Sequence, residues 1–289
     1  MIASASDVAA PPRLPAPPGA CDCHMHVYGP PERYRIAPGA KPPPAGADLA
    51  RYCDAVMRRL GLSRVVVVQP SAYGMDNACT LDAVAALGAE VARAVVAVTP
   101  ETPEAELARL HALGARGARF VLVEAHPMLD WKSLPEVAAR VAPLGWHVQL
   151  QFDGGTLPER EALIRALPCP VVIDHNGRFH DPVPPDREPV RALLRLLETG
   201  RVWVKCSSPY GVSRAGPPDY ADVAAIARAI IRAAPERVVW GSNWPHPNPP
   251  PDHRPDEAAL FDLLGDWVPD EATRRRILAD NPAVLYGYG

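Results

Sequence analysis

The sequence has few lysines and lacks the features of several large protein classes. Only three residues are lysine, so arginine supplies most of the positive charge, and the net charge is −3. Because no long basic run or stripe occurs, we do not expect nucleic acid as a partner. No apolar stretch approaches the ~18 residues that cross a bilayer, so we do not expect a membrane partner either.

The six cysteines form no CxxC pair and are scattered along the chain. Several lie in runs that we expect to be buried strands, which predicts reduced thiols and a cytoplasmic location. The first residues show no signal-peptide pattern, in agreement with this expectation. Cys21 and Cys23 are an alternative pair of zinc ligands, but we expect both to face the helices.

Eight short runs rich in valine and isoleucine alternate with amphipathic segments. The runs show little internal alternation, which is typical of parallel strands buried on both faces. The expected strands are 20–27, 64–69, 93–99, 117–123, 147–152, 171–174, 202–206 and 237–241. The expected helices are 48–60, 77–89, 103–113, 133–144, 158–166, 189–197, 220–234, 256–264 and 271–278.

This order of elements predicts an α/β fold of the (β/α)8 TIM-barrel type. An open doubly wound sheet is the alternative, but no GxGxxG motif follows any strand. We expect residues 1–19, rich in proline and alanine, to form a tail, and residues 20–289 to form a single barrel domain. Proline-rich stretches at 38–46, 182–189 and 247–255 should form loops at the carboxyl end of the barrel, where active sites are built.

The first expected strand contains the sequence DCHMH at residues 22–26. Alternate side chains of an extended strand share a face. We therefore expect Asp22, His24 and His26 to point to one side and the intervening residues, including Cys23, to the other. Two imidazoles and a carboxylate on one face indicate a chemical site.

Polar residues are concentrated where the expected strands end, and in a barrel they converge on one pocket. They are Ser71 and Tyr73 after the second strand, Arg119 in the fourth, Gln151 and Asp153 at the fifth, His175 and Arg178 at the sixth, Lys205 and Arg214 at the seventh, and Asn243 and His246 at the eighth. Desolvating a charge is costly, so Arg119 and Lys205 inside apolar runs need an explanation. They either contact substrate or form a structural ion pair with Asp22 or Asp174.

Four motifs occur in order along the chain, the first three at expected strands, and resemble the amidohydrolase superfamily. The similarity extends from about residue 20 to the end of the sequence. It is closest to the branch that contains 2-pyrone-4,6-dicarboxylate lactonase and related sugar lactonases. The motifs are Asp22-Cys-His24-Met-His26, Val-Val-Ile-Asp174-His175-x-Gly177-Arg178, Gly241-Ser242-Asn243-Trp244-Pro245-His246 and Asp280-Asn281-Pro282-x-x-Leu285-Tyr286.

The resemblance implies a distorted barrel with its active site at the carboxyl face. It implies that His24, His26 and His175 surround the carbonyl group of a lactone, without a required metal ion. It also implies that Arg119 and Arg178 hold substrate carboxylates through forked hydrogen bonds. The further candidates for substrate binding are Ser71, Tyr73, Gln151 and Arg214.

The sequence departs from the pattern of this family at several positions, including an acidic stretch at 123–126 where the pyrone lactonase has a second arginine. Asn243 stands where the family has an acid in its eighth strand, and an amide cannot accept a proton near neutral pH. Asn243 can hold a water molecule or a substrate hydroxyl, and the base is then His246 or Asp153. Gln151 replaces the fifth-strand tyrosine of the pyrone lactonase, which puts pyrone dicarboxylate in doubt as the substrate.

The same departures bear on the cofactor. Metal-dependent amidohydrolases have a histidine at the end of the fifth strand and an acid at the eighth, and this sequence has neither. We therefore expect no cofactor. The alternative is one Zn or Mn ion held by His24, His26 and His175, since catalytic zinc can be bound by three protein ligands, with Glu124 as an uncertain fourth.

Together, these residues predict a hydrolase that opens a small carboxylated lactone of aromatic- or sugar-acid catabolism, with the histidine cluster polarising the carbonyl. Three alternatives stay open. A substrate hydroxyl oriented by Asn243 would make the protein a lactone isomerase. A bound metal ion would suit a decarboxylase, and an inactive Asp-to-Asn form would only bind its ligand. The sequence leaves the oligomeric state open.

Overall fold

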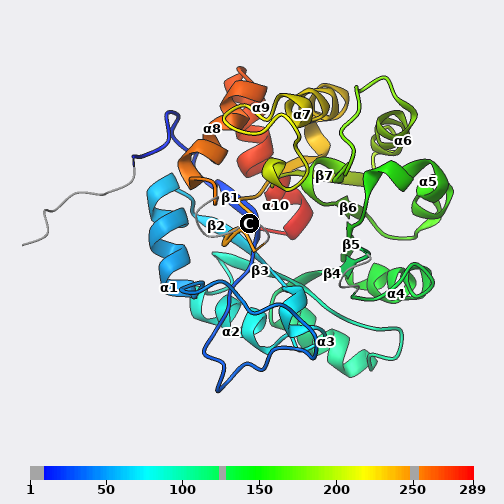
Figure 1. Cartoon of the computed structure of the whole chain (residues 1–289). Coiled ribbons are helices and arrows are strands. Elements are labelled where there is room, and N and C mark those ends of the chain that lie inside the picture. Colours follow the sequence, from blue (N-terminus) through cyan, green and yellow to red (C-terminus); the bar gives the residue numbers. More distant parts are fainter. Residues whose placement is uncertain (1–9, 124–127, 248–253) are drawn as a thin grey trace, which may run out of the picture.

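The computed structural model describes residues 10–123, 128–247 and 254–289. Its centre is an eight-stranded parallel sheet in which each strand pairs with the next strand along the chain (Figure 1). The strands are β1 (Cys21–Met25), β2 (Arg64–Val68), β3 (Ala92–Val96), β4 (Ala115–Val121), β5 (His147–Gln151), β6 (Val171–Ile173), β7 (Val202–Cys206) and β8 (Val238–Trp240).

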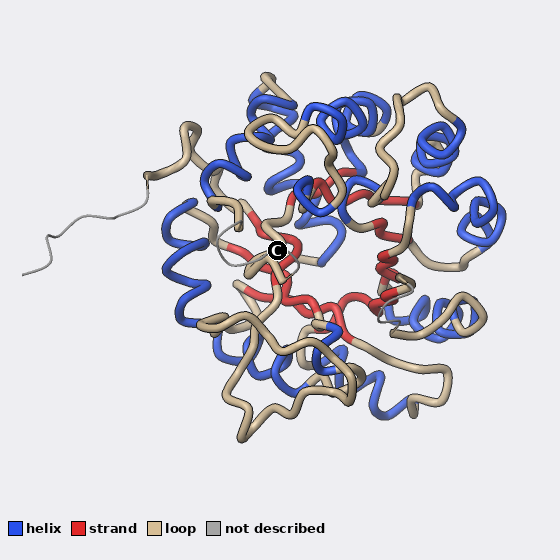
Figure 2. Tube along the Cα trace, in the orientation of Figure 1, coloured by secondary structure: helices blue, strands red, loops and turns tan. Residues whose placement is uncertain are grey.

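Helices surround the ring of strands on its outside (Figure 2). They are α1 (Leu49–Tyr52), α2 (Ala78–Leu87), α3 (Glu104–Ala112), α4 (Leu134–Val141), α5 (Leu157–Ala166), α6 (Glu188–Leu197), α7 (Ala221–Ala233), α8 (Glu257–Trp267), α9 (Glu271–Arg275) and α10 (Asn281–Tyr286). The π-helical segments η1 (Cys53–Arg58) and η9 (Arg276–Asp280) continue α1 and α9. None of the helices in the described residues has the length and apolar character of a membrane span.

The sheet closes into a barrel between β1 and the segment that follows β8. The backbone N–H of Asn243 donates to the His24 carbonyl oxygen at 2.7 Å, and the backbone N–H of His26 donates to the Trp244 carbonyl oxygen at 2.8 Å. Met25 and Trp244 form a parallel bridge at the same place. The predicted (β/α)8 barrel is confirmed, and each strand begins and ends within a few residues of its expected bounds.

The two faces of the barrel wall pack in different layers. Outward-facing residues such as Val67 join the core between strands and helices. Inward-facing residues such as Val66 pack with Tyr286 and Tyr288 from the C-terminal segment. Tyr288 Oη donates to the Val65 carbonyl oxygen at 2.7 Å, near the start of β2. The C-terminal segment therefore fills the base of the barrel, and the carboxyl end of the strands is left to form a site.

The faces expected for β1 are wrong. Cys21 and Cys23 pack in the barrel interior, whereas Asp22 points toward the helices, where Tyr52 Oη of α1 donates to it at 3.0 Å. The pairing of β1 with β2 shifts register between Asp22 and Met25. A β-bulge of this kind interrupts the alternation of side chains, so Asp22 does not share a face with the histidines that follow it.

The residues that precede β1 pack along the outside of the barrel. Arg13 pairs with Asp262 and Asp266 of α8 at 3.2 and 2.7 Å. Arg59, which follows η1, donates to the Ala10 carbonyl oxygen at 2.7 Å. The division of the chain into a tail of residues 1–19 and one barrel domain stays a prediction.

Candidate active site

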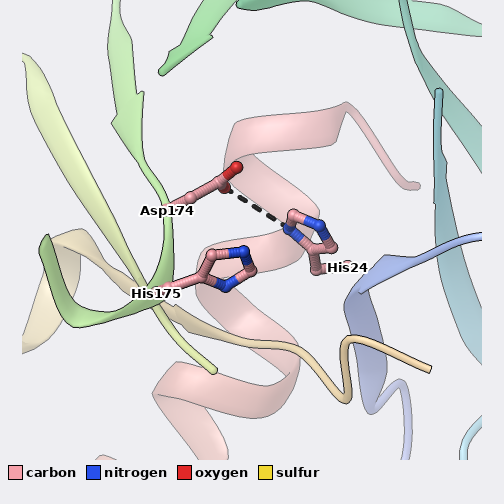
Figure 3. Close-up of side chains that lie close together, drawn as sticks. All are labelled: His24, Asp174 and His175. Atoms are coloured by element: carbon pink, nitrogen blue, oxygen red, sulfur yellow. Dashed lines mark ion pairs between the residues drawn. The ribbon is translucent and has the colours of Figure 1, made fainter. Parts of the chain in front are cut away.

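Three histidines lie together at the carboxyl end of the barrel interior. His24 belongs to β1, His26 follows this strand, and His175 begins the single turn η5 (His175–Gly177) after β6. His24 Nε2 is 3.3 Å from His26 Nε2, and the ring centroids of His24 and His175 are 4.8 Å apart. Figure 3 shows the His24 and His175 rings beside the Asp174 carboxylate. The structure thus brings together the three imidazoles that the sequence singled out.

Two of the three imidazoles are held by a hydrogen bond through Nδ1. His26 Nδ1 donates to the Val68 carbonyl oxygen at 2.8 Å, and His175 Nδ1 is 2.8 Å from Ser207 Oγ. His24 Nδ1 is 3.3 Å from Asp174 Oδ1, the pair joined by a dashed line in Figure 3. His24 Nδ1 and Asp174 Oδ1 form no hydrogen bond at this distance. The anchored rings of His26 and His175 each direct Nε2 toward a neighbour or a ligand.

All three imidazoles are neutral at pH 7 because they are buried. Burial lowers the pKa of His24 and His175 well below the ordinary value, and it lowers the pKa of His26 to about 3. The nearby cation Arg119 lowers the pKa of all three further, because it repels a charged ring. A neutral His26 that donates from Nδ1 presents an unprotonated Nε2.

The single proton of a neutral His24 can serve only one of its two neighbours. If Nδ1, which lies 3.3 Å from Asp174 Oδ1, carries the proton, the unprotonated Nε2 atoms of His24 and His26 face each other across 3.3 Å. Two facing lone pairs repel each other unless a proton or a cation lies between them. With the proton on His24 Nδ1, the point between the two Nε2 atoms is therefore where a proton or a Lewis acid would bind most favourably.

A buried cation lies directly below the cluster. Lys205 Nζ donates to the carbonyl oxygen of Cys23 at 2.7 Å and to Gln149 Oε1 at 2.6 Å, and it is 4.0 Å from Asp174 Oδ1. Burial lowers the pKa of Lys205 to about 8, against the opposing effect of Asp174. Of the two alternatives for Lys205, the structure shows the ion pair, and its partner is Asp174. Asp22 instead accepts from Ser242 Oγ at 2.5 Å, behind the barrel wall.

A cavity of about 920 Å³ opens beside the histidines, and His26 and His175 are part of its wall. Arg119 lines it and donates to the Gln69 carbonyl oxygen and, at 2.7 Å, to Gln151 Oε1. Arg119 forms no ion pair among the described residues, so the structural alternative for this arginine is not observed. The other predicted residues that line the cavity are Ser71, Gln151, Asp153, Arg178 and Asn243.

Four predicted site residues, His24 of the cluster and three others, are not part of the cavity wall. Tyr73 is buried, and its Oη accepts from the backbone N–H of Gly29 at 3.0 Å. Arg214 is exposed and pairs with Asp181 at 2.7 Å. His246 is buried behind the wall, where it contacts Tyr210 and Glu257. Glu124, the uncertain metal ligand, is outside the described residues.

Sequence reasoning missed two cations of the cavity wall. Lys41 lines the cavity from the loop before α1, and Arg160 lines it from the first turn of α5. The Arg160 guanidinium lies over the Trp131 ring, 4.8 Å from its centroid. The proline-rich stretch 38–46 indicated the loop that carries Lys41. No signal indicated Arg160, because helical arginines are ordinarily solvated and the chain has many of them.

The backbone at this end of the barrel adopts left-handed conformations at non-glycine residues. The φ angles are 56°, 55° and 47° at His175, Asn176 and Arg178, and 58° and 57° at Asn243 and His246. Such conformations cost of order 1–3 kcal/mol each and persist only where the surrounding structure holds them. The turns after β6 and β8 are therefore fixed by their contacts and do not follow from local sequence preference.

The donor set of the cluster is chemically suited to a divalent cation. One ring nitrogen of His24, one of His175 and one Asp174 oxygen lie within 4.8 Å of one another. His26 adds an unprotonated nitrogen 3.3 Å from His24 Nε2. Neutral imidazoles and a carboxylate are the ligands that zinc commonly takes in catalytic sites.

Comparison with known proteins agrees with the sequence motifs. A family model described as Amidohydrolase matches residues 21–288. The chain is 38% identical over 286 residues to a 2-pyrone-4,6-dicarboxylate hydrolase of Comamonas testosteroni, covering 95% of this chain and 92% of the relative. It is 37% identical over 276 residues to a D-galactarolactone isomerase of Agrobacterium fabrum, covering 93% and 91%.

A solved structure shows the same likeness in three dimensions. The apo crystal structure of a protein from Agrobacterium tumefaciens superimposes with a TM-score of 0.89 at 37% sequence identity, over 96% of this chain and 99% of that protein. The resemblance inferred from the strand-end motifs and the expectation of a lactonase-like enzyme are confirmed. The chain belongs to the amidohydrolase family.

Proposed function

We propose that this protein hydrolyses the ring ester of a small carboxylated lactone. The observation that carries the proposal is a cluster of three buried, neutral imidazoles at a cavity whose wall includes Arg119 and Arg178. Neither arginine has a carboxylate partner within 4.0 Å among the described residues, and the Nε atoms of both are buried without a hydrogen-bond partner. Such guanidinium groups suit a carboxylate of the substrate.

Asp153 is the better of the two candidate bases for a water nucleophile. Its carboxylate lines the cavity, whereas His246 does not. Asp153 Oδ1 accepts from the backbone N–H groups of Gly155 and His180 at 3.0 and 3.1 Å. These bonds leave its second oxygen available for water.

The proposed reaction begins with the substrate carboxylate against Arg119 and Arg178. Water attacks the carbonyl carbon of the lactone, and its proton passes to the Asp153 carboxylate. The resulting oxyanion accepts a hydrogen bond from His175 Nε2, with Nδ1 held by Ser207. The ring C–O bond then breaks, and the leaving oxygen takes the proton from Asp153. A donor aimed at the oxyanion typically contributes a few kcal/mol.

A Zn or Mn ion bound here would be held by His24, His26 and His175 and would polarise the same carbonyl group. We propose that turnover does not require it. Lys205 Nζ, 4.0 Å from Asp174 Oδ1, already neutralises the acid of the cluster. Asn243 supplies no negative charge to offset a dication.

A panel of carboxylated lactones, assayed for acid release with and without a chelator, tests the proposal. We expect at least one lactone to be opened at a rate that the chelator leaves unchanged. We expect the His24→Ala and His175→Ala variants to leave that lactone intact. Full activity in either variant would rule out the assignment. Activity lost with the chelator and restored by Zn or Mn would show that a metal ion is required.

Lactone isomerisation is the second candidate, and Asn243 favours it. An amide at the end of the eighth strand can orient a substrate hydroxyl but cannot remove a proton from water. One relative is named D-galactarolactone isomerase. Turnover in ¹⁸O-labelled water separates the two reactions: hydrolysis places one labelled oxygen in the acid product, whereas transfer to a substrate hydroxyl gives an unlabelled lactone.

A further inference from the structure

A chain of four polar side chains lies behind the cavity wall and ends on Asn243. Asn243 Nδ2 is 2.8 Å from Tyr210 Oη, Tyr210 Oη is 2.7 Å from His246 Nδ1, and His246 Nε2 is 2.7 Å from Glu257 Oε1. Tyr210 comes from the single turn η6 (Pro209–Gly211) after β7, and Glu257 is the first residue of α8. Asn243 lines the cavity, whereas the other three do not.

When His246 is neutral, the contacts among these four side chains determine which groups donate and which accept, starting from Glu257. A Glu257 carboxylate can only accept, so His246 donates from Nε2. A neutral His246 then has an unprotonated Nδ1, which must accept from the Tyr210 hydroxyl. Tyr210 Oη has no further proton, so it accepts from the Asn243 side-chain nitrogen. Ser208 Oγ, 3.3 Å from the same nitrogen, is a second acceptor for it.

We propose that Glu257, His246 and Tyr210 are positioning residues that hold the Asn243 amide with its carbonyl oxygen toward the substrate. This inference rests on the proposed function of the cavity as a lactone site. The amide NH2 is committed to Tyr210 and Ser208 on the far side, so the face presented to the cavity is an acceptor only. It therefore selects a hydroxyl group, of water or of the substrate, and orients its oxygen toward the lactone carbonyl.

The alternative is that every hydrogen bond between His246 and Asn243 runs in the opposite direction. A His246 with both nitrogens protonated would donate to Tyr210, the Tyr210 hydroxyl would then donate to the amide oxygen, and the NH2 group would face the cavity. The two arrangements differ in one proton on His246 and in which end of Asn243 meets the substrate. Crystallographic positions of the amide oxygen and nitrogen do not distinguish them.

The first measurement is the steady-state kinetics of variants of Tyr210, with a lactone that the unmodified protein opens as the substrate. Tyr210→Phe removes the acceptor for the amide, so we expect kcat to fall about tenfold with KM nearly unchanged, because Arg119 and Arg178 stay in place. Tyr288→Phe is the matched control, since it removes a buried tyrosine hydrogen bond at the base of the barrel. We expect it to lower the Tm without lowering kcat. An unchanged kcat in Tyr210→Phe, or an equal loss of kcat in both variants, would overturn the proposal.

Glu257 variants and the protonation of His246 provide the second measurement. Glu257→Gln keeps an acceptor for His246 Nε2, so we expect it to retain much of the activity that Glu257→Leu loses. ¹⁵N NMR of histidine-labelled protein should show His246 neutral, with the proton on Nε2. A doubly protonated His246, or equal damage from both Glu257 variants, would establish the reverse polarity and overturn the proposal. The NMR result does not depend on turnover. It therefore tests the orientation of the Asn243 amide even if the protein opens no lactone.

Discussion

Both ends of the barrel interior contain a buried histidine with a strongly lowered pKa, but only one end arranges its histidines for chemistry. At the base, His147 in β5 packs edge-on against Tyr286, with ring centroids 5.4 Å apart. Neither of its ring nitrogens has a hydrogen-bond partner among the described residues. At the carboxyl end, His26 and His175 are each held through Nδ1.

The comparison shows that a lowered pKa does not by itself identify a functional histidine. Burial lowers the pKa of His147 and of His26 to about 3. What differs is anchoring: a ring held through one nitrogen directs the other at a defined point, whereas His147 only fills space. Its packing is tight, because a Cβ at Gly117 would lie 2.4 Å from His147 Nε2.

The sharpest way to break this comparison is to remove one histidine from each end. We expect His175→Gln to lower kcat/KM about a thousandfold, because it takes away the donor to the oxyanion. We expect His147→Leu to change kcat/KM less than about threefold, since this residue does not line the cavity. Steady-state kinetics on one lactone, with circular dichroism to check folding, measures both. Similar losses in the two variants would contradict the distinction.

Two buried arginines also differ between the carboxyl end and the base of the barrel, and we expect a smaller effect from replacing them. Arg119 lines the cavity, whereas Arg93 in β3 donates to the Gly287 carbonyl oxygen at 2.7 Å and lies 4.5 Å from the centroid of the Tyr288 ring, at the base. We expect Arg119→Met to raise KM about 100-fold, since a charged hydrogen bond contributes roughly 1.5–3 kcal/mol. We expect Arg93→Met to lower the Tm and leave KM unchanged. A normal KM in Arg119→Met would remove this residue from substrate binding.

The sequence predicted the barrel and the position of the histidine cluster, because both follow from patterns that repeat along the chain. Strand spacing places His24 and His175 at carboxyl ends whatever the local details. The bulge in β1 was not predictable, because it arises from pairing with β2, and it moved Asp22 to the outer face. Contacts between distant loops were equally hidden: nothing near Tyr210 in the sequence indicates α8.

Loop residues were the least predictable part of the site. Arg214 follows the seventh strand as a substrate ligand would, yet its guanidinium pairs with Asp181 on the surface. Arg160, which sequence reasoning did not select, lines the cavity from α5. Strand ends are placed by the hydrogen-bonded ladder of the sheet, but a side chain on a loop or a helix is placed by contacts that the sequence does not display.

The smallest expected effect is on acid stability, where the two ends of the barrel should behave alike. An unfolded histidine takes up a proton near pH 6.5, whereas folded His147 and His26 do so only at about pH 3. Between these values the unfolded chain binds more protons, so the free energy of unfolding falls as the pH falls, by up to about 1.4 kcal/mol per pH unit for each histidine. Asp22 acts in the opposite direction below about pH 6, because burial raises its pKa to about 6 and the folded state takes up that proton first.

His147→Leu isolates the contribution of one histidine to the pH dependence of stability. Neither ring nitrogen of His147 has a hydrogen-bond partner in the described part of the chain, so the substitution leaves no polar group there unpaired. Denaturant unfolding at pH 7 and pH 5 should show a loss of stability that is smaller than in the unmodified protein by up to ~2 kcal/mol. Both proteins retain Asp22 and the histidines of the carboxyl end. The difference between their losses of unfolding free energy therefore reports His147 alone. An identical loss in both proteins would mean that His147 becomes protonated while folded. The base of the barrel would then admit water or a counter-charge, and the contrast with the carboxyl end would rest on anchoring alone.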